Sequence, residues 1–216
     1  MTNRFTDISL RTAARVTGLG FILMFALALF ADGFVLQSLV VPGDATTTVN
    51  NIKANELLFS LGIAGYIIIL ALDTVISLTL YVILKPVNKS LSSLTAVLRL
   101  LYTAIMGISL FALVLLFINE YSYGKLIAYI FFISHVFLLG YLVFKSGYIP
   151  RSLGVFLIIA SFCYIILLYG DYILPKNLEV LSMIAMMPAT FAEISLGIWL
   201  LLKGVKIHQP SDDPVP

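Results

Sequence analysis

The chain has 216 residues, of which 61% are hydrophobic and only 11% are charged, and its formal net charge is +2. A typical soluble domain is about 45–50% apolar and about 25% charged, and a chain of this size buries only part of its surface on folding. The composition therefore excludes an ordinary soluble domain and indicates that lipid is the main solvent. The small charge, with no basic tract between aromatic residues, does not indicate a nucleic-acid partner.

Six apolar runs are each long enough to cross a bilayer, whose hydrocarbon core of about 30 Å requires about 20 helical residues. The breaks between the runs contain proline, glycine, asparagine or charged residues, which mark turns. The chain is therefore predicted to be an all-α, polytopic transmembrane bundle of six helices. The predicted spans are residues 16–38, 57–84, 94–118, 126–144, 152–174 and 179–202, and the third turn is predicted at NEYSYGK, residues 119–125.

The same pattern divides the chain into three parts. Residues 1–15 are predicted to be a cytoplasmic N-terminal segment, residues 16–203 a single six-helix transmembrane domain, and residues 204–216 a disordered cytoplasmic tail. The first apolar run is long for a signal peptide, so it is expected to be retained as a span. The polar connection 39–55 is expected to be a lid or a plain connector.

Lysine and arginine are distributed unevenly between the two ends of the predicted helices. Nine lie at the N-terminus, in the second and fourth connections and at the C-terminus, and three lie on the opposite side. The positive-inside rule then predicts that both termini are cytoplasmic. The larger group is Arg4, Arg11, Arg15, Lys85, Lys89, Lys145, Arg151, Lys203 and Lys206, and the smaller group is Lys53, Lys125 and Lys176.

Four ionisable residues interrupt the predicted spans: Asp73, Arg99, His135 and Glu193. Each lies ten to twelve residues from a cytoplasmic lysine at the end of its own helix, which corresponds to about 15–18 Å along the helix axis. The four are therefore expected to share one layer near the bilayer midplane. Because a lone charge there costs about 2.5–3.5 kcal/mol, these side chains are expected to face the bundle interior and to pair.

The spacing also predicts a role for each member of this layer. Arg99 is expected to bind a carboxylate or to neutralise Asp73, whereas Glu193 and His135 are expected to take up and release protons, since imidazole titrates near neutrality. With His135 protonated, the four charges can sum to zero. Three further residues lie on the same helical faces and are predicted to line a pocket: Tyr66, Tyr102 and Thr190.

Three functions are open for this layer. The leading hypothesis is binding or passage of a small molecule, ion or lipid, as in a transporter. The main alternative is a non-catalytic membrane scaffold whose charges only fix helix packing. The second alternative is an intramembrane metal-dependent hydrolase or transferase that uses Asp73, His135 and Glu193 as metal ligands, although no HExxH spacing is present. No cofactor motif and no catalytic residue is identified, so an enzyme is not the leading expectation.

Three stretches resemble a family of prokaryotic six-helix membrane proteins that is classified as a domain of unknown function. They are ALDTVISLTLYVILKPVNKSLSSLTAVLRLLY, HVFLLGYLVFKSGYIPRSLGVFLIIASFCYI and AEISLGIWLLLKG, and they extend from the second predicted span to the sixth. The resemblance implies a multi-pass protein of the prokaryotic cytoplasmic (inner) membrane, with the lipid bilayer as its partner. It assigns no binding residue, so the pocket prediction rests on the pattern of this chain.

Overall fold

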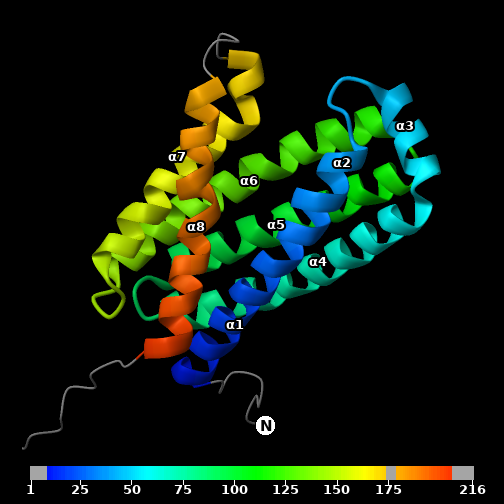
Figure 1. Cartoon of the computed structure of the whole chain (residues 1–216). Helices are drawn as coiled ribbons and strands as arrows, with labels where there is room; N and C mark the ends of the chain where they lie inside the picture. The colour runs from blue at the N-terminus through cyan, green and yellow to red at the C-terminus, as the bar shows by residue number, and fades with distance from the viewer. Residues whose placement is uncertain (1–8, 174–178, 206–216) are drawn as a thin grey trace, which may run out of the picture.

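The computed structural model describes residues 9–173 and 179–205, which form helices and short connections with no strand among them (Figure 1). The all-α prediction is therefore confirmed. The helices are α1 Leu10–Ala28, the π-helical segment η1 Leu29–Leu36, α2 Gln37–Leu39, α3 Ala45–Ala54, α4 Glu56–Leu84, α5 Lys89–Val114, α6 Ile118–Lys145, α7 Arg151–Ile173 and α8 Glu179–Lys203.

Five helical segments in the described residues are long and apolar enough to cross a membrane, as expected for a multi-pass membrane protein. They are Leu10–Leu39, Glu56–Leu84, Lys89–Val114, Ile118–Lys145 and Arg151–Tyr169. The first of them runs without interruption through α1, η1 and α2. Helix α8 has 25 residues and contains Pro188. The six-span count stays a prediction.

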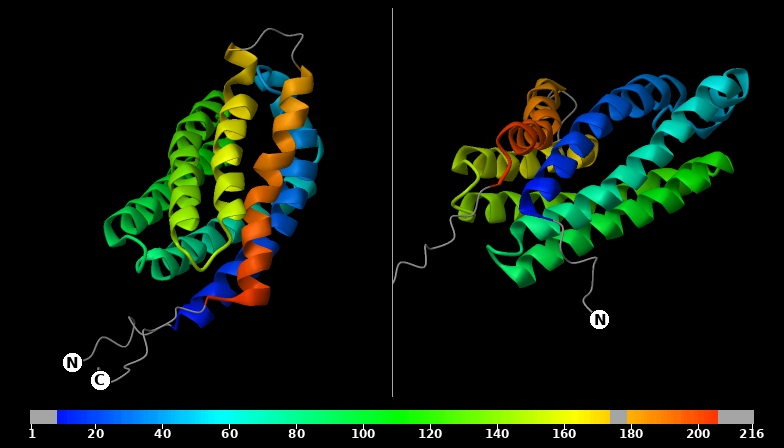
Figure 2. Two further views of the ribbon diagram at one scale, coloured as in Figure 1. Left: turned by 90° about the vertical axis from the view of Figure 1, so that its left-hand side faces the viewer. Right: turned by 90° about the horizontal axis from the view of Figure 1, so that it is seen from below.

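The long helices pack in a ring. Helix α1 contacts α4 on one side and α8 on the other, and the remaining neighbours follow chain order from α4 through α5, α6 and α7 to α8 (Figures 1 and 2). The ends of α1 and α8 meet, because a Cβ built on Gly204 would lie 3.9 Å from Arg11 Cγ. A residue in the middle of each of these helices can therefore face one shared interior.

Two helices begin earlier than predicted because a side chain caps each of them. Ser9 accepts a hydrogen bond from the backbone N–H of Thr12 at 3.1 Å, so α1 begins at Leu10 rather than at residue 16. Asn88 accepts one from the N–H of Leu91 at 2.9 Å, so α5 begins at Lys89 rather than at residue 94. Such caps satisfy backbone donors that a helix start leaves unpaired. Residues 1–8 of the predicted N-terminal segment and 206–216 of the predicted tail lie outside the described residues.

The turn predicted at residues 119–125 is wrong. Helix α5 ends at Val114 and α6 begins at Ile118, so the turn is the apolar stretch 115–117. Leu116 adopts a φ of 61°, in the left-handed region that stops an α-helix. The polar stretch then forms the start of α6, where Glu120 lies in the first turn and interacts favourably with the helix dipole.

The connection predicted as a lid or plain connector contains α3. Asp44 caps this helix, because its Oδ1 accepts a hydrogen bond from the backbone N–H of Thr47 at 2.9 Å and its Oδ2 accepts one from the Thr47 hydroxyl at 2.7 Å. These two bonds hold the pKa of Asp44 below its usual value, and the bond from the backbone N–H of Thr47 has the larger effect. The hydroxyl of Thr48 accepts a further bond from the N–H of Val41 at 2.9 Å, which ties the connection to α3.

Candidate functional site

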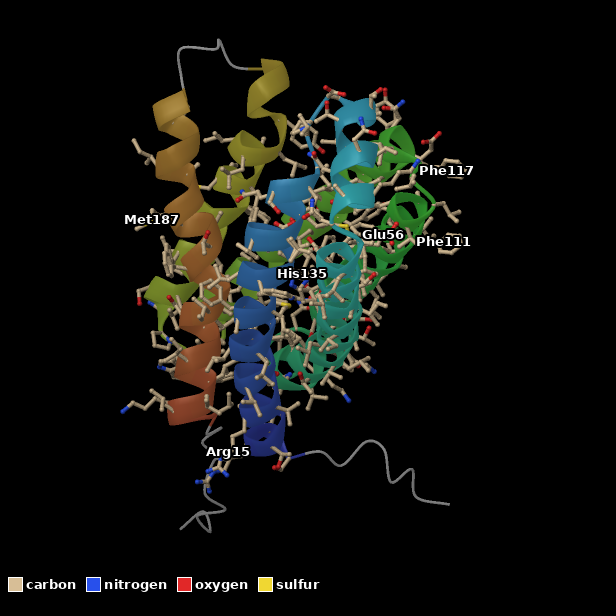
Figure 3. The ribbon with its side chains drawn as sticks, turned by 45° about the vertical axis from the view of Figure 1, so that its right-hand side comes forward. Arg15, Glu56, Phe111, Phe117, His135 and Met187 are labelled. Atoms are coloured by element: carbon tan, nitrogen blue, oxygen red, sulfur yellow. The ribbon has the colours of Figure 1, made fainter. Side chains whose placement is uncertain are left out.

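The four ionisable side chains from the middle of the helices meet in the interior of the ring. Asp73 comes from α4, Arg99 from α5, His135 from α6 and Glu193 from α8. Their exposed fractions are 2%, 0%, 0% and 8% in that order. His135 lies between Arg15 at one end of the molecule and Phe117 at the other (Figure 3). We refer to these four residues as the charged cluster.

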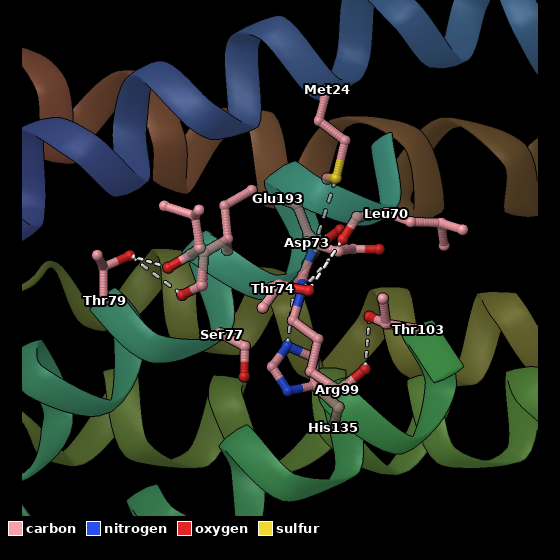
Figure 4. Close-up of polar contacts among 12 residues, drawn as sticks. Met24, Leu70, Asp73, Thr74, Ser77, Thr79, Arg99, Thr103, His135 and Glu193 are labelled. Atoms are coloured by element: carbon pink, nitrogen blue, oxygen red, sulfur yellow. Dashed lines mark hydrogen bonds and ion pairs between the residues drawn. The ribbon is translucent and has the colours of Figure 1, made fainter. Parts of the chain in front are cut away.

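Arg99 is the centre of the charged cluster (Figure 4). Its Nε donates to Asp73 Oδ1 at 2.8 Å, and its Nη2 lies 2.6 Å from the same oxygen. Its Nη1 donates to Glu193 Oε1 at 2.6 Å and lies 3.0 Å from His135 Nε2. Nη2 also donates to Met24 Sδ at 3.8 Å. A guanidinium carries five N–H groups; four of them form these hydrogen bonds, and Nη2 also pairs with the Asp73 carboxylate.

Two aromatic rings complete the surroundings of the guanidinium. Arg99 Cζ lies 5.3 Å from the ring centre of Phe21 and 5.8 Å from that of Phe132. Cations are attracted to aromatic faces at this range. Arg99 is therefore held by ion pairs and hydrogen bonds in its plane and by aromatic contacts, which explains how a fully buried arginine is accommodated.

The hydrogen bonds of His135 fix its protonation state. Its Nδ1 lies 2.8 Å from the carbonyl oxygen of Thr95, which can only accept, so Nδ1 carries a proton. Its Nε2 faces the N–H donor of Arg99 and must therefore act as the acceptor. The imidazole is neutral, with both nitrogens engaged. The expectation that His135 supplies a second positive charge, or carries protons, does not fit this geometry.

The numbers of positive and negative charges in the cluster consequently differ. Asp73 and Glu193 supply two negative charges when ionised, Arg99 supplies one positive charge, and His135 supplies none. With both carboxyls ionised, the set therefore carries one excess negative charge instead of the expected sum of zero. One proton or one monovalent cation would balance it.

A cavity of about 290 Å³ adjoins the charged cluster and extends toward η1 and α2. The charged residues in its lining are Asp32, Asp73, Arg99 and Glu193, and Tyr66, Tyr102 and Thr190 line it as well. His135 is not part of the lining and lies behind Arg99. Of the residues expected to form a pocket, the structure therefore brings all except His135 to the cavity wall.

Two carboxylate oxygens in the cavity wall have no hydrogen-bond partner among the residues that the structure describes. Arg99 contacts only Oδ1 of Asp73 and only Oε1 of Glu193, and no hydrogen bond to Oδ2 or Oε2 is present among the described residues. In that same part of the chain, every fully buried side-chain oxygen or nitrogen has a partner. The two remaining oxygens must therefore have accessible surface, and the cavity that both residues line provides it.

The outer part of the cavity contains residues that sequence analysis missed as site residues. Asp32 lies in the π-helical segment η1 and accepts a hydrogen bond from the Tyr66 hydroxyl at 2.8 Å, and its Oδ1 lies 3.8 Å from Lys125 Nζ. π-Helical turns within longer helices are frequent at functional sites. Tyr66 lies two helical turns from Asp73 on α4, but this spacing does not indicate which residue of another helix its hydroxyl contacts.

Aromatic residues form a large part of the cavity wall. Phe132 lies one turn before His135 on α6. Tyr164 of α7 packs against the Phe132 ring, with the two ring centres 5.1 Å apart. Tyr102 packs on the other side of Phe132 with ring centres 4.7 Å apart. The sequence analysis overlooked Phe132 and Tyr164, although the spacing of Phe132 from His135 placed it on the same face.

The geometry does not fit the metal-site alternative. Both nitrogens of His135 are engaged by Arg99 and Thr95, and a guanidinium lies between the two carboxylates that would share the metal. A positive charge at that position opposes a cation at the same point. No group of three or more His, Cys, Asp or Glu residues that could hold a metal ion occurs within residues 9–173 and 179–205.

Residues 16–118 and 111–204 match the protein family described as domain of unknown function DUF4386. These ranges cover most of the 216 residues. The chain belongs to this family. An uncharacterised protein of Archaeoglobus fulgidus is 35% identical to the DUF4386 protein described here over 157 residues, which are 70% of this chain and 89% of that relative. No solved structure matches the chain.

The matched ranges of the DUF4386 protein include the whole site. Asp73 and Arg99 lie in the first range, and His135 and Glu193 lie in the second. The resemblance recognised in the sequence is thereby confirmed. Because the family has no assigned function, the chemistry of the DUF4386 site rests on its geometry.

Proposed function

We propose that this DUF4386 protein is a six-span protein of the prokaryotic cytoplasmic membrane that binds, or allows the passage of, a small molecule in its internal cavity. The observation that carries the proposal is the cavity of about 290 Å³ between Asp32 and the charged cluster, with two carboxylate oxygens facing it. Small-molecule sites are concave and largely apolar, with a few polar groups that orient the ligand. This cavity has that composition.

The ends of the ring support an orientation with both termini in the cytoplasm. The hydroxyl of Tyr148, in the connection between α6 and α7, donates to the carbonyl of Ile83 near the end of α4. This bond holds the connections 85–88 and 146–150 at the same end of the molecule. Four of the nine lysines and arginines assigned to the cytoplasm flank these two connections: Lys85, Lys89, Lys145 and Arg151.

The scaffold hypothesis explains part of the cluster. Arg99 and His135 have all their polar atoms engaged by neighbouring helices, as a structural role requires. It does not explain why Asp73 and Glu193 each keep one oxygen directed to a cavity. We therefore assign a positioning role to Arg99 and His135 and a ligand-binding role to the two carboxylates.

Filling the cavity tests the proposal. Ala28 lines the cavity and is half-buried, so Ala28→Phe places a ring in the space without removing any polar group. The purified full-length protein is screened by thermal unfolding against small amines, carboxylates, zwitterions and neutral polar compounds. We expect at least one class to raise the melting temperature of the wild type in a saturable manner and to lose this effect in Ala28→Phe.

Gly107→Ala is the matched control, because an added Cβ there would contact only Leu70 Cδ1 at 3.6 Å and Gly107 does not line the cavity. This variant should respond as the wild type does. If no class stabilises the wild type, or if Ala28→Phe responds normally, the cavity is not a binding site and the proposal is wrong.

A further inference from the structure

We infer that the ligand of this cavity is a small organic cation, bound through its charged nitrogen by the free oxygens of Asp73 and Glu193. This inference rests on the proposed function and names the ligand class. Four steps lead from the site to this ligand class: the charge of the cluster, the hydrogen bonds already made by Arg99, the chemistry of the cavity walls and the size of the space.

The first step is the charge excess. Asp73 and Glu193 share a single buried counter-charge on Arg99, because His135 is neutral. Buried charges are stable only when they are paired. A ligand with one positive charge would balance the cluster, and its N–H groups would reach the two carboxylate oxygens that have no partner among the described residues.

The second step excludes an anionic ligand. Arg99 is the only cationic side chain in the cavity lining as described, and all three of its nitrogens already donate hydrogen bonds, two of them also forming ion pairs. A carboxylate or phosphate would have to displace Asp73 or Glu193 from it. The same anion would also face Asp32, the third carboxylate in the lining.

The third step is the aromatic wall. Tyr102, Tyr129 and Tyr164 line the cavity together with Phe132, and the centres of neighbouring rings in this group lie 4.7–6.3 Å apart. Aromatic faces attract organic ammonium groups and cover the attached hydrocarbon. A hydrated metal ion gains little from such a wall, so it favours an organic cation over an inorganic one.

The fourth step is size. A volume of about 290 Å³ lies at the small end of the range of about 300–1,000 Å³ for small-molecule sites. An amine with one ring or a short chain suits a space of this size. Asp32 at the outer end of the cavity provides a carboxylate along the route toward the cluster.

Three probes of one shape test the inference: benzylamine, benzyl alcohol and benzoate at pH 7, which differ mainly in charge. Each is titrated against the purified full-length protein by thermal shift and by calorimetry. We expect benzylamine to bind at least tenfold more tightly than either of the other two. Tetramethylammonium, which has no N–H donor, should bind more weakly than benzylamine. Ala28→Phe should abolish the binding of both compounds, because both are expected to occupy the same cavity.

Two variants test the role of the carboxylates. Asp73→Asn and Glu193→Gln each remove the excess negative charge, so each should weaken benzylamine at least tenfold. Because they leave Arg99 with one carboxylate, both should melt no lower than the wild type without ligand. Asp44→Asn, which changes a carboxylate in the exposed connection before α3, should bind benzylamine normally.

The outcomes separate the inference from the proposed function. If benzoate or benzyl alcohol binds as tightly as benzylamine, the cavity binds ligands but the inference of a cationic ligand is wrong. If benzylamine binds equally to both carboxylate variants, the inference is also wrong. If amines have no effect while another class stabilises the wild type and not Ala28→Phe, the proposed function holds and a proton alone balances the cluster.

Discussion

The single residues of the buried layer have different roles. Arg99 is fully buried and all three of its nitrogens donate hydrogen bonds, whereas Asp73 and Glu193 each use one oxygen for Arg99 and leave the other facing the cavity. Removing Arg99 would leave two buried carboxylates without their counter-charge. Breaking a buried ion pair in this way costs far more than replacing the whole pair by neutral groups.

We therefore predict that Arg99→Met destabilises the protein by about 3–5 kcal/mol. Thermal unfolding of the purified protein measures this effect. The triple variant Asp73→Asn, Arg99→Met, Glu193→Gln should recover a substantial part of the loss, because it contains no unpaired charge. A triple variant that melts as low as Arg99→Met would mean that the hydrogen bonds of Arg99, rather than its charge, hold the helices together.

The sequence was enough to predict which residues form this layer, but not the protonation state of His135 or the resulting net charge of the layer. Counting from each ionisable residue to a lysine at the end of its own helix was enough to place Asp73, Arg99, His135 and Glu193 at one height. The proton on His135 depends on its contact with the carbonyl of Thr95, a backbone atom of another helix. Such a contact leaves no pattern in the sequence of α6.

At the scale of helices, close approach depends on glycine. Gly140 on α6 and Gly154 on α7 bring two backbones together, because a Cβ built on Gly154 would lie 2.6 Å from the backbone nitrogen of Phe144 and 2.7 Å from the carbonyl oxygen of Gly140. Neither atom can move without shifting its helix. Small residues at such positions allow the tight packing on which membrane helices rely.

Gly154→Ala is therefore predicted to destabilise the protein by about 1–3 kcal/mol despite the higher helix propensity of alanine. For a chain of this length, each kcal/mol should lower the melting temperature by about 2–4 °C. Gly107→Ala is the comparison: its Cβ would make one ordinary contact with Leu70 at 3.6 Å, so it should melt at the wild-type temperature or above. Equal melting of the two variants would contradict the packing argument.

Helix existence was predictable, whereas helix ends and irregularities were not. The apolar runs identified the long helices, because lipid imposes the same length requirement on each of them. The turn after α5 was misplaced, because polar residues 119–125 continue into α6 as its first turns and the break instead occurs at Leu116. The π-helical segment η1 was not predictable either, since LFADGFVL contains no proline and reads as a continuous helix.

At the scale of the whole molecule, the ring explains how one cavity draws on every long helix. Helix α1 closes the ring by packing between α4 and α8, although residues far apart in sequence form this contact. The Thr17 hydroxyl donates to the Thr79 hydroxyl at 2.6 Å, which links α1 to α4 close to the charged cluster. Sequence periodicity identifies the inward faces but not the order of helices around the ring. Periodicity therefore predicted that the four ionisable residues face inward, but not which helices are neighbours in the ring.

The same arrangement makes the orientation in the membrane testable. The connections 85–88 and 146–150 are joined by the hydrogen bond between Tyr148 and Ile83, and α3 lies at the opposite end of the molecule. Asp32 lines the cavity from η1, which leads through α2 to α3, and its side chain is 42% exposed, so we place the mouth of the cavity there. If lysine and arginine set the orientation, residues 85–88 and 146–150 face the cytoplasm and α3 faces outward. The cavity then opens to the outside.

We predict the labelling pattern of single cysteines introduced into a Cys163→Ser background, since Cys163 is the one native cysteine. In intact cells, a membrane-impermeant maleimide should label Thr46→Cys on α3 and should label Ser90→Cys and Ser152→Cys only after permeabilisation, because all three positions are exposed. The reverse pattern would place the termini outside and the cavity mouth in the cytoplasm. An amine would then reach Asp73 and Glu193 from inside the cell, so this experiment also fixes the compartment that supplies the ligand.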